Sequence, residues 1–169
     1  MGKSFHRSVR KLANKNNMGY DIVRCKENGE PHEIKEVHDP NYFRWNIFGM
    51  ERVRDLAAWG VGALTNQDIG NTMDDSGGQP NSMEEMMRQI AESFQPKSYS
   101  KELPWGSAFV HNGETVSAKD CKSFVAALEA AQQKIFSSPV QPDWPAMNWD
   151  YLESFIDYLE CSPHGVYVG

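Results

Sequence analysis

The most constraining feature of this sequence is a set of three helical apolar patterns, two of which begin beside a serine that can cap a helix. The first pattern follows Ser82, the second follows Ser117 and the third begins near Asn148. Glu85 and Asp120 stand three residues after the two serines, as in a capping box. The predicted buried faces are Met83, Met86, Met87, Ile90, Ala91 and Phe94; Cys121, Phe124, Val125, Leu128 and Ile135; and Trp149, Leu152, Phe155, Ile156 and Leu159.

A fourth helix is predicted after the aromatic segment 41–50. Its buried face consists of Met50, Val53, Leu56, Ala57 and Trp59, and Gly60 is a plausible end. Residues 60–81 are rich in Gly, Asn, Asp, Thr and Ser, which predicts a long surface loop. Residues 137–147 contain three prolines and predict a linker to the last helix, which extends to about Pro163.

Short strands are predicted between the helices. Residues 18–25 read as a strand, and the Asn28-Gly29 turn predicts a hairpin with residues 32–38 as the returning edge strand. A second hairpin is predicted from residues 107–111 and 114–116 around Asn112-Gly113, and residues 166–168 read as a terminal strand. The pattern predicts one α+β domain over residues 18–169, in which about four helices pack on a small, mostly antiparallel sheet.

Charge is sorted along the chain. Residues 1–17 carry five basic residues and no acid, namely Lys3, Arg7, Arg10, Lys11 and Lys15. From Ile135 to the end there are five acids and no Lys or Arg, within a chain of net charge −6. We therefore predict that residues 1–17 are a basic N-terminal extension appended to the domain. The acidic balance argues against a protein whose whole surface binds nucleic acid.

The last predicted helix carries a stripe of acids on the side opposite its apolar face. These residues are spaced three, four and three apart, and they are Asp150, Glu153, Asp157 and Glu160. The stripe is either an ordinary solvated face or a docking surface for a basic partner, which could also be the protein's own basic extension. The Met-rich pattern after Ser82 has two similar interpretations, an adaptable binding surface or core, and the pattern favours core.

Composition also bears on the compartment. No run of 18 apolar residues is present, so we expect no membrane-spanning helix. The basic N-terminus is not followed by an apolar stretch of the kind that a secretory signal contains. Cys25, Cys121 and Cys161 are odd in number and widely spaced, which favours free thiols in a reducing cytoplasm.

The sequence offers little sign of a metal site or of catalytic chemistry. Cys25, His32 and His38 lack the closely paired ligands that zinc sites usually contain, so we predict no metal site. Cys161 and His164 lie close in sequence, but without an orienting third group they predict a structural terminus rather than a nucleophile and its base. Phosphate-binding and nucleophile-elbow motifs are absent, and we predict no cofactor and no catalytic residue.

Three segments resemble a loose set of small uncharacterised bacterial proteins. They are the Met-Gly-Tyr-Asp start at Met18, the aromatic block Phe43–Met50, and the Asn-Gly-Glu-Thr-Val-Ser-Ala-Lys-Asp run that ends at Asp120. Such proteins carry an aromatic block with Asn before a helix and a hairpin that runs into another helix. The resemblance covers most of residues 18–169 and implies an α+β domain, without an activity or site to transfer.

These observations lead to one main functional hypothesis and two alternatives. The main hypothesis is a non-enzymatic cytoplasmic binding protein, of the inhibitor or immunity type, whose acidic C-terminal surface meets a basic protein partner. The first alternative is an accessory nucleic-acid-binding protein, from a bacterium or a phage, that acts through residues 1–17. The second alternative is a small hydrolase whose site is assembled from residues distant in sequence.

Overall fold

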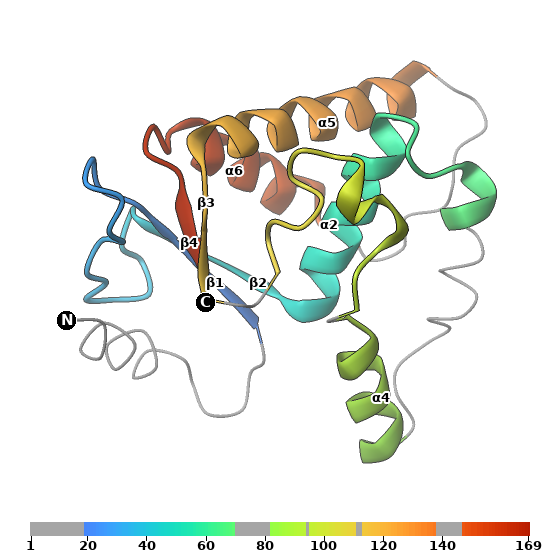
Figure 1. The fold of residues 1–169 in the computed structure, drawn as a ribbon, viewed down its shortest axis with the longest axis horizontal. Coiled ribbons are helices and arrows are strands. Elements are labelled where there is room, and N and C mark those ends of the chain that lie inside the picture. Colours follow the sequence, from blue (N-terminus) through green and yellow to red (C-terminus); the bar gives the residue numbers. More distant parts are fainter. Residues whose placement is uncertain (1–18, 70–81, 94, 111–112, 138–146) are drawn as a thin grey trace.

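A four-stranded antiparallel sheet forms the centre of the fold, with the strand order β2–β1–β4–β3 (Figure 1). The computed structural model describes residues 19–69, 82–93, 95–110, 113–137 and 147–169. The strands are β1 (Gly19–Arg24), β2 (Tyr42–Asn46), β3 (Glu114–Val116) and β4 (Val166–Val168). Because β1 and β4 occupy the middle of the sheet, the two ends of the described chain pair with each other.

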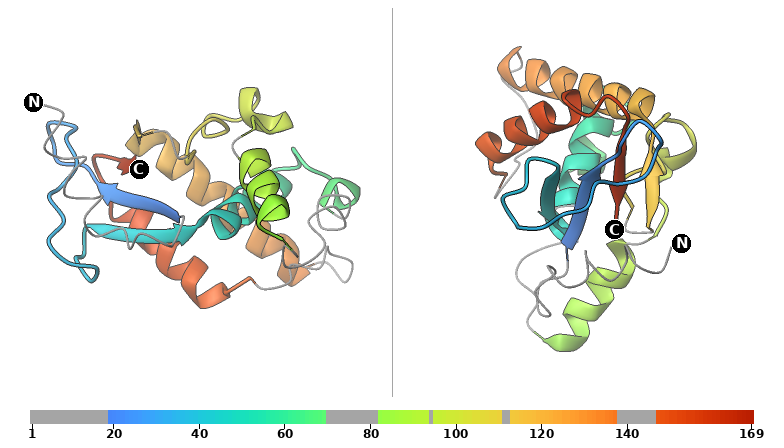
Figure 2. Two further views of the ribbon diagram at one scale, coloured as in Figure 1. Left: turned by 90° about the horizontal axis from the view of Figure 1, so that it is seen from below. Right: turned by 90° about the vertical axis from the view of Figure 1, so that its left-hand side faces the viewer.

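The helical elements are α2 (Ile47–Gly60), α4 (Met83–Ser93), the 3₁₀ helix η1 (Ser98–Lys101), α5 (Ala118–Ser137) and α6 (Trp149–Glu160). Of these, α2, α5 and α6 pack against one face of the sheet (Figure 2). Tyr20 and Ile22 of β1 join a single buried cluster with side chains of α2, α5 and α6. The opposite face of the sheet carries a small second cluster of Val23, Cys25, Ile34 and Tyr167. The predicted α+β fold is confirmed.

α2 and α5 approach closely where α2 ends. A Cβ atom at Gly60 would lie only 2.4 Å from the Ala127 carbonyl oxygen and 2.7 Å from the Ala131 backbone nitrogen. Gly60 is the last residue of α2, as the sequence indicates, but its small size also lets the backbones of the two helices meet. The Lys134 ammonium group donates to the Trp59 carbonyl at 2.7 Å at the end of α2, where the same carbonyl also accepts from the Gly62 N–H at 3.1 Å.

The first hairpin was predicted with the wrong return strand. The turn forms as expected, since Gly29 has a φ of +81° and its N–H donates to the Lys26 carbonyl. Residues 32–38, however, form no strand, and β1 pairs instead with Tyr42–Asn46. The reason is burial. Phe43 and Trp45 are two residues apart on β2, so both side chains face the main core, whereas Ile34 is the only buried side chain of residues 32–38.

The second predicted hairpin is also wrong. β3 forms at Glu114–Val116, but its partner is β4 at the C-terminus, and residues 107–110 are not in a strand. All three β4 residues are buried, so their backbone N–H and C=O groups must be paired, and β1 and β3 pair them from the two sides. The strand at residues 166–168 was predicted, but its position between β1 and β3 in the sheet was not.

The predicted buried faces of α2 and α5 are confirmed, with Ile135 only partly buried. In α6, Leu152, Phe155, Ile156 and Leu159 are buried, but Trp149 is 38% exposed, which corrects its assignment to the core. The core assignment of the α4 face is largely wrong as well. Ile90 is buried and Met86 is partly buried, whereas Met83, Met87 and Ala91 are exposed. Phe94 lies outside the described residues.

Several predictions fall wholly or partly outside the described residues. The basic extension 1–17, most of the predicted linker 137–147 and residues 70–81 of the predicted long loop lie there. The described part of that loop, 61–69, contains a short helical turn whose Ile69 side chain is buried. Among the described helices, none has the length and apolar character needed to cross a bilayer.

Candidate functional site

α6 is a helix with one face fixed in the core and the other fully solvated. It begins at Asn148, whose side chain accepts a hydrogen bond from the Tyr151 N–H at 3.0 Å. Its buried face packs against the sheet and α5, through Leu152, Phe155, Ile156, Tyr158 and Leu159. The predicted acidic stripe, which we define as Asp150, Glu153, Asp157 and Glu160, lies on the solvated side with all four residues exposed.

The charges of the acidic stripe are not neutralised by the rest of the described protein. None of its four carboxylates forms an ion pair with a residue that the structure places. Asp150 lies in the first turn, where the helix dipole favours a negative charge, but Glu160 lies at the unfavourable C-terminal end. The three neighbouring pairs along the stripe repel one another by about 0.2–0.5 kcal/mol each. A positive partner would relieve this repulsion.

Two partly exposed aromatic side chains lie at the start of α6. Trp149 and Tyr151 are each 38% exposed. Trp149 precedes Glu153 by four residues, so the indole lies on the same side of the helix as the stripe. Tyr151 packs edge-on against Trp45, with ring centroids 4.8 Å apart, and its hydroxyl donates to the Arg44 carbonyl at the edge of the sheet. An exposed indole beside carboxylates can contact both the apolar stem and the charge of Arg or Lys.

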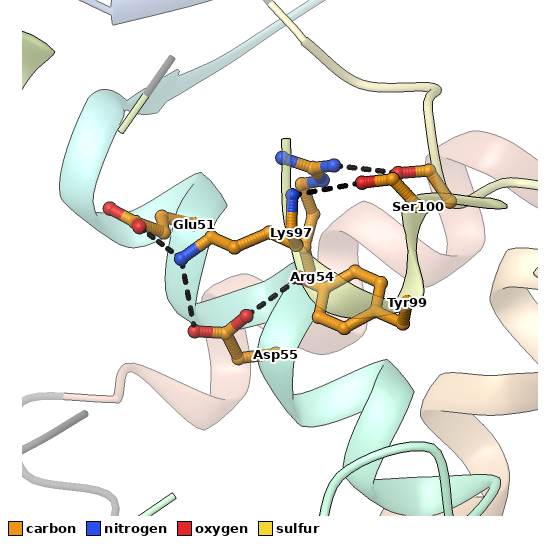
Figure 3. Close-up of polar contacts among 7 residues, drawn as sticks. Glu51, Arg54, Asp55, Lys97, Tyr99 and Ser100 are labelled. Carbon is orange, nitrogen blue, oxygen red and sulfur yellow. Dashed lines mark hydrogen bonds and ion pairs between the residues drawn. The ribbon is translucent and has the colours of Figure 1, made fainter. Parts of the chain in front are cut away.

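A second polar cluster lies between α2 and the segment that contains η1 (Figure 3). The Lys97 ammonium group lies between the carboxylates of Glu51 and Asp55, and its nitrogen is 3.7 Å from Asp55 Oδ2. The Tyr99 hydroxyl donates to Asp55 Oδ1 at 2.6 Å. Arg54 donates from Nη2 to the Gly106 carbonyl at 2.8 Å. One turn of α2 therefore holds the segment from residue 97 to residue 106.

Burial governs the electrostatics of this cluster. It raises the pKa of Asp55 above its ordinary value, although the Lys97 charge and the Tyr99 hydrogen bond both act to lower it. Burial and the nearby Asp55 carboxylate raise the pKa of Tyr99, so its hydroxyl stays protonated and donates. Arg54 is 2% exposed, and its Nε has no hydrogen-bond partner. Since Tyr99 and Trp105 are also buried, the cluster holds this segment against α2.

Sequence reasoning did not find this cluster. Glu51, Arg54 and Asp55 share one side of α2, and such a set of charges normally indicates a solvated helix face. The contact that buries them comes from residues 97–106, more than 40 positions away. The sequence contained one signal for this cluster, namely a charged face on a helix whose other residues are mostly apolar.

The remaining predicted site residues do not converge on a common centre. Cys25 is buried, His32 is half-buried and His38 is exposed, and the described residues contain no group of three metal-ligating side chains. Cys161 and His164 are exposed, while Ser162 between them is buried and accepts from Arg24 Nε at 3.1 Å. The five basic residues of the extension lie outside the described residues.

Comparisons with protein-family models, with curated proteins and with solved structures found no match.

Proposed function

We propose that this protein is a non-enzymatic cytoplasmic binding protein, of the inhibitor or immunity type, and that the acidic stripe of α6 docks a basic protein partner. The observation that supports this most is the stripe itself, whose four residues are exposed and form no ion pair with another described residue. Its carboxylates sit on a helix whose opposite face is buried in the main core. The backbone that carries these charges is therefore fixed before the partner arrives, which lowers the entropic cost of binding.

Trp149 supplies the apolar contact that a purely charged surface lacks. Surface ion pairs contribute little free energy, because solvent and salt screen them. Interfaces gain most of their affinity from a few anchors, among which Trp is enriched. An indole that is 38% exposed at the start of the stripe can serve as such an anchor. The carboxylates would then direct the approach and orientation of the basic partner.

The proposal can be tested by capture with two charge-matched variants. The stripe variant carries Asp150→Asn, Glu153→Gln, Asp157→Asn and Glu160→Gln. The loop variant neutralises four exposed glutamates elsewhere, Glu27, Glu30, Glu33 and Glu36, by substitution with Gln. Both variants change the net charge equally, so only the position of the lost charge differs.

We expect a Lys- and Arg-rich protein to be captured from the cell of origin by the wild type and the loop variant, but not by the stripe variant. If the captured protein is an enzyme or a toxin, its activity should fall when the wild type is added. Capture that is equal for the two variants, or the absence of any protein that discriminates between them, would contradict the proposal.

A further inference from the structure

α4 stands apart from the body of the protein and packs only lightly against it (Figures 1 and 2). The helix begins after Ser82, whose hydroxyl accepts from the Glu85 N–H at 3.1 Å. Ile90 is buried and Met86 packs partly against the main core. The face of α4 adjacent to these two residues is exposed to solvent, and on it Met83 is 70% exposed and Met87 is 57% exposed.

The exposed methionines form a continuous strip. Met83 and Met87 are four residues apart and therefore lie one above the other on the helix. Ala91, four residues further, is exposed as well. The strip, defined as Met83, Met87 and Ala91, has a length of about 12 Å along the helix axis. Methionine side chains are flexible and polarisable, so such a strip can adapt to the apolar side chains of a partner.

Charge decides which partner fits the Met strip. α4 itself carries three acids, Glu84, Glu85 and Glu92, and one base, Arg88, whose guanidinium group is bound to Glu85. Glu84, next to the strip, is exposed. Nucleic acid and anionic membranes would be repelled by this charge, and two copies of a chain with net charge −6 would repel each other. A segment with an apolar strip and basic flanks would be attracted.

We propose that the Met strip of α4 docks a basic amphipathic helix of a partner protein, whose apolar residues cover Met83 and Met87. A partner helix that packs lengthwise along α4 would match the straight, narrow form of the strip. The Lys or Arg residues of this partner helix would lie beside Glu84. This inference rests on the proposal that the protein is a binding protein, but it uses a different surface from the acidic stripe.

The test uses full-length protein with isotope-labelled methionine methyl groups and a defined probe. The probe is a 16-residue helical peptide of Leu and Lys, and its counterpart carries Glu in place of Lys. The test variant is Met83→Gln with Met87→Gln. The control variant is Val37→Gln with Val61→Gln, because these valines are 56% and 48% exposed on other segments. The stripe variant of α6 is titrated in parallel.

We expect the Lys peptide to shift the methyl signals of Met83 and Met87 and the Glu peptide to leave them unchanged. The Met variant should weaken Lys-peptide binding by about tenfold or more, since burial of the two side chains is lost. The valine variant should stay within about twofold of the wild type, because its substitutions lie away from the strip. The stripe variant should leave the peptide-induced methyl shifts of Met83 and Met87 unchanged, because its substitutions also lie away from the strip.

Four results would overturn the inference. Three of them are equal binding of the Lys peptide by the wild type and the Met variant, equal binding of the two peptides, and methyl shifts that depend on protein concentration without peptide. The last result would show that a second copy covers the strip. Lys-peptide binding that is lost only in the stripe variant would also overturn it, while leaving the proposed role of α6 intact.

Discussion

Replacement of Phe155 by Ala removes the side chain on which α6 depends most. Phe155 is fully buried, and its ring centroid lies 5.1 Å from that of Phe43, 5.7 Å from that of Trp45 and 6.5 Å from that of Phe124. Truncation of a buried Phe costs about 3–5 kcal/mol, and lost aromatic pairs place the expected value in the upper part of that range. For a chain of this length, the melting temperature should fall by about 6–20 °C.

The assay is urea unfolding followed by circular dichroism, with Phe136→Ala as the control. Phe136 is 88% exposed at the end of α5, so its truncation should change stability by less than about 0.5 kcal/mol. The slope of free energy against urea should be similar in all three proteins, because each unfolds a similar surface. A loss below about 1 kcal/mol for Phe155→Ala would refute the reasoning, since α6 would then not be anchored in the core.

Three further predictions concern the interior and the N-terminus. Because burial raises the pKa of Asp55, its stabilising contribution is fully present below its unfolded pKa near 3.9 and is lost as the pH rises through the folded pKa. Because Asn cannot ionise, the free energy of unfolding of Asp55→Asn in urea should change less with pH than that of the wild type between about pH 4 and neutral pH. The same pH dependence in both proteins would contradict this. Gly60→Ala should cost about 1–3 kcal/mol in the same assay, because its methyl group would meet the backbone of α5, and wild-type stability would disprove the close contact. Deletion of residues 1–17 should leave the melting temperature almost unchanged but abolish any low-salt binding of labelled oligonucleotides; failure to fold, or binding that survives physiological salt, would contradict it.

Local signals in the sequence predicted the helices well. The Ser117 hydroxyl accepts from the Asp120 N–H at 3.1 Å, as its cap pattern predicts, and the Asn148 side chain caps α6. These contacts join residues three positions apart, so the sequence contains the whole interaction. The predicted faces of α2 and α5 followed from helical periodicity for the same reason.

Strand pairing could not be predicted in this way. The Asn-Gly pairs correctly indicate turns but carry no information about which strand completes the sheet. β3 pairs with β4 across some 50 residues, and β1 skips residues 32–38 to reach Tyr42. Both strand pairings depend on the burial of aromatic and β-branched side chains against helices that come from elsewhere in the chain.

The surfaces show the same limit. The exposure of the acidic stripe follows from its position opposite an apolar face and was predicted. The apolar face of α4 has the pattern of a buried face, yet tertiary packing covers only Ile90 and part of Met86 and leaves the Met strip exposed. The charged turn at Asp55 has the pattern of a solvated face, yet residues 97–106 bury it. Periodicity identifies the faces of a helix but does not say which partner covers each one.

The most direct test of the proposed function is a calorimetric titration of the captured basic partner at two salt concentrations. The wild type, the stripe variant and the loop variant are compared under identical conditions. We expect the stripe variant to weaken binding at low salt by tenfold or more, equivalent to about 1.4 kcal/mol, and to lose most of the salt dependence. The loop variant should bind like the wild type, because its lost charges lie outside the stripe. Equal affinities and equal salt dependence for the two variants would contradict the role of Asp150, Glu153, Asp157 and Glu160 as the docking surface.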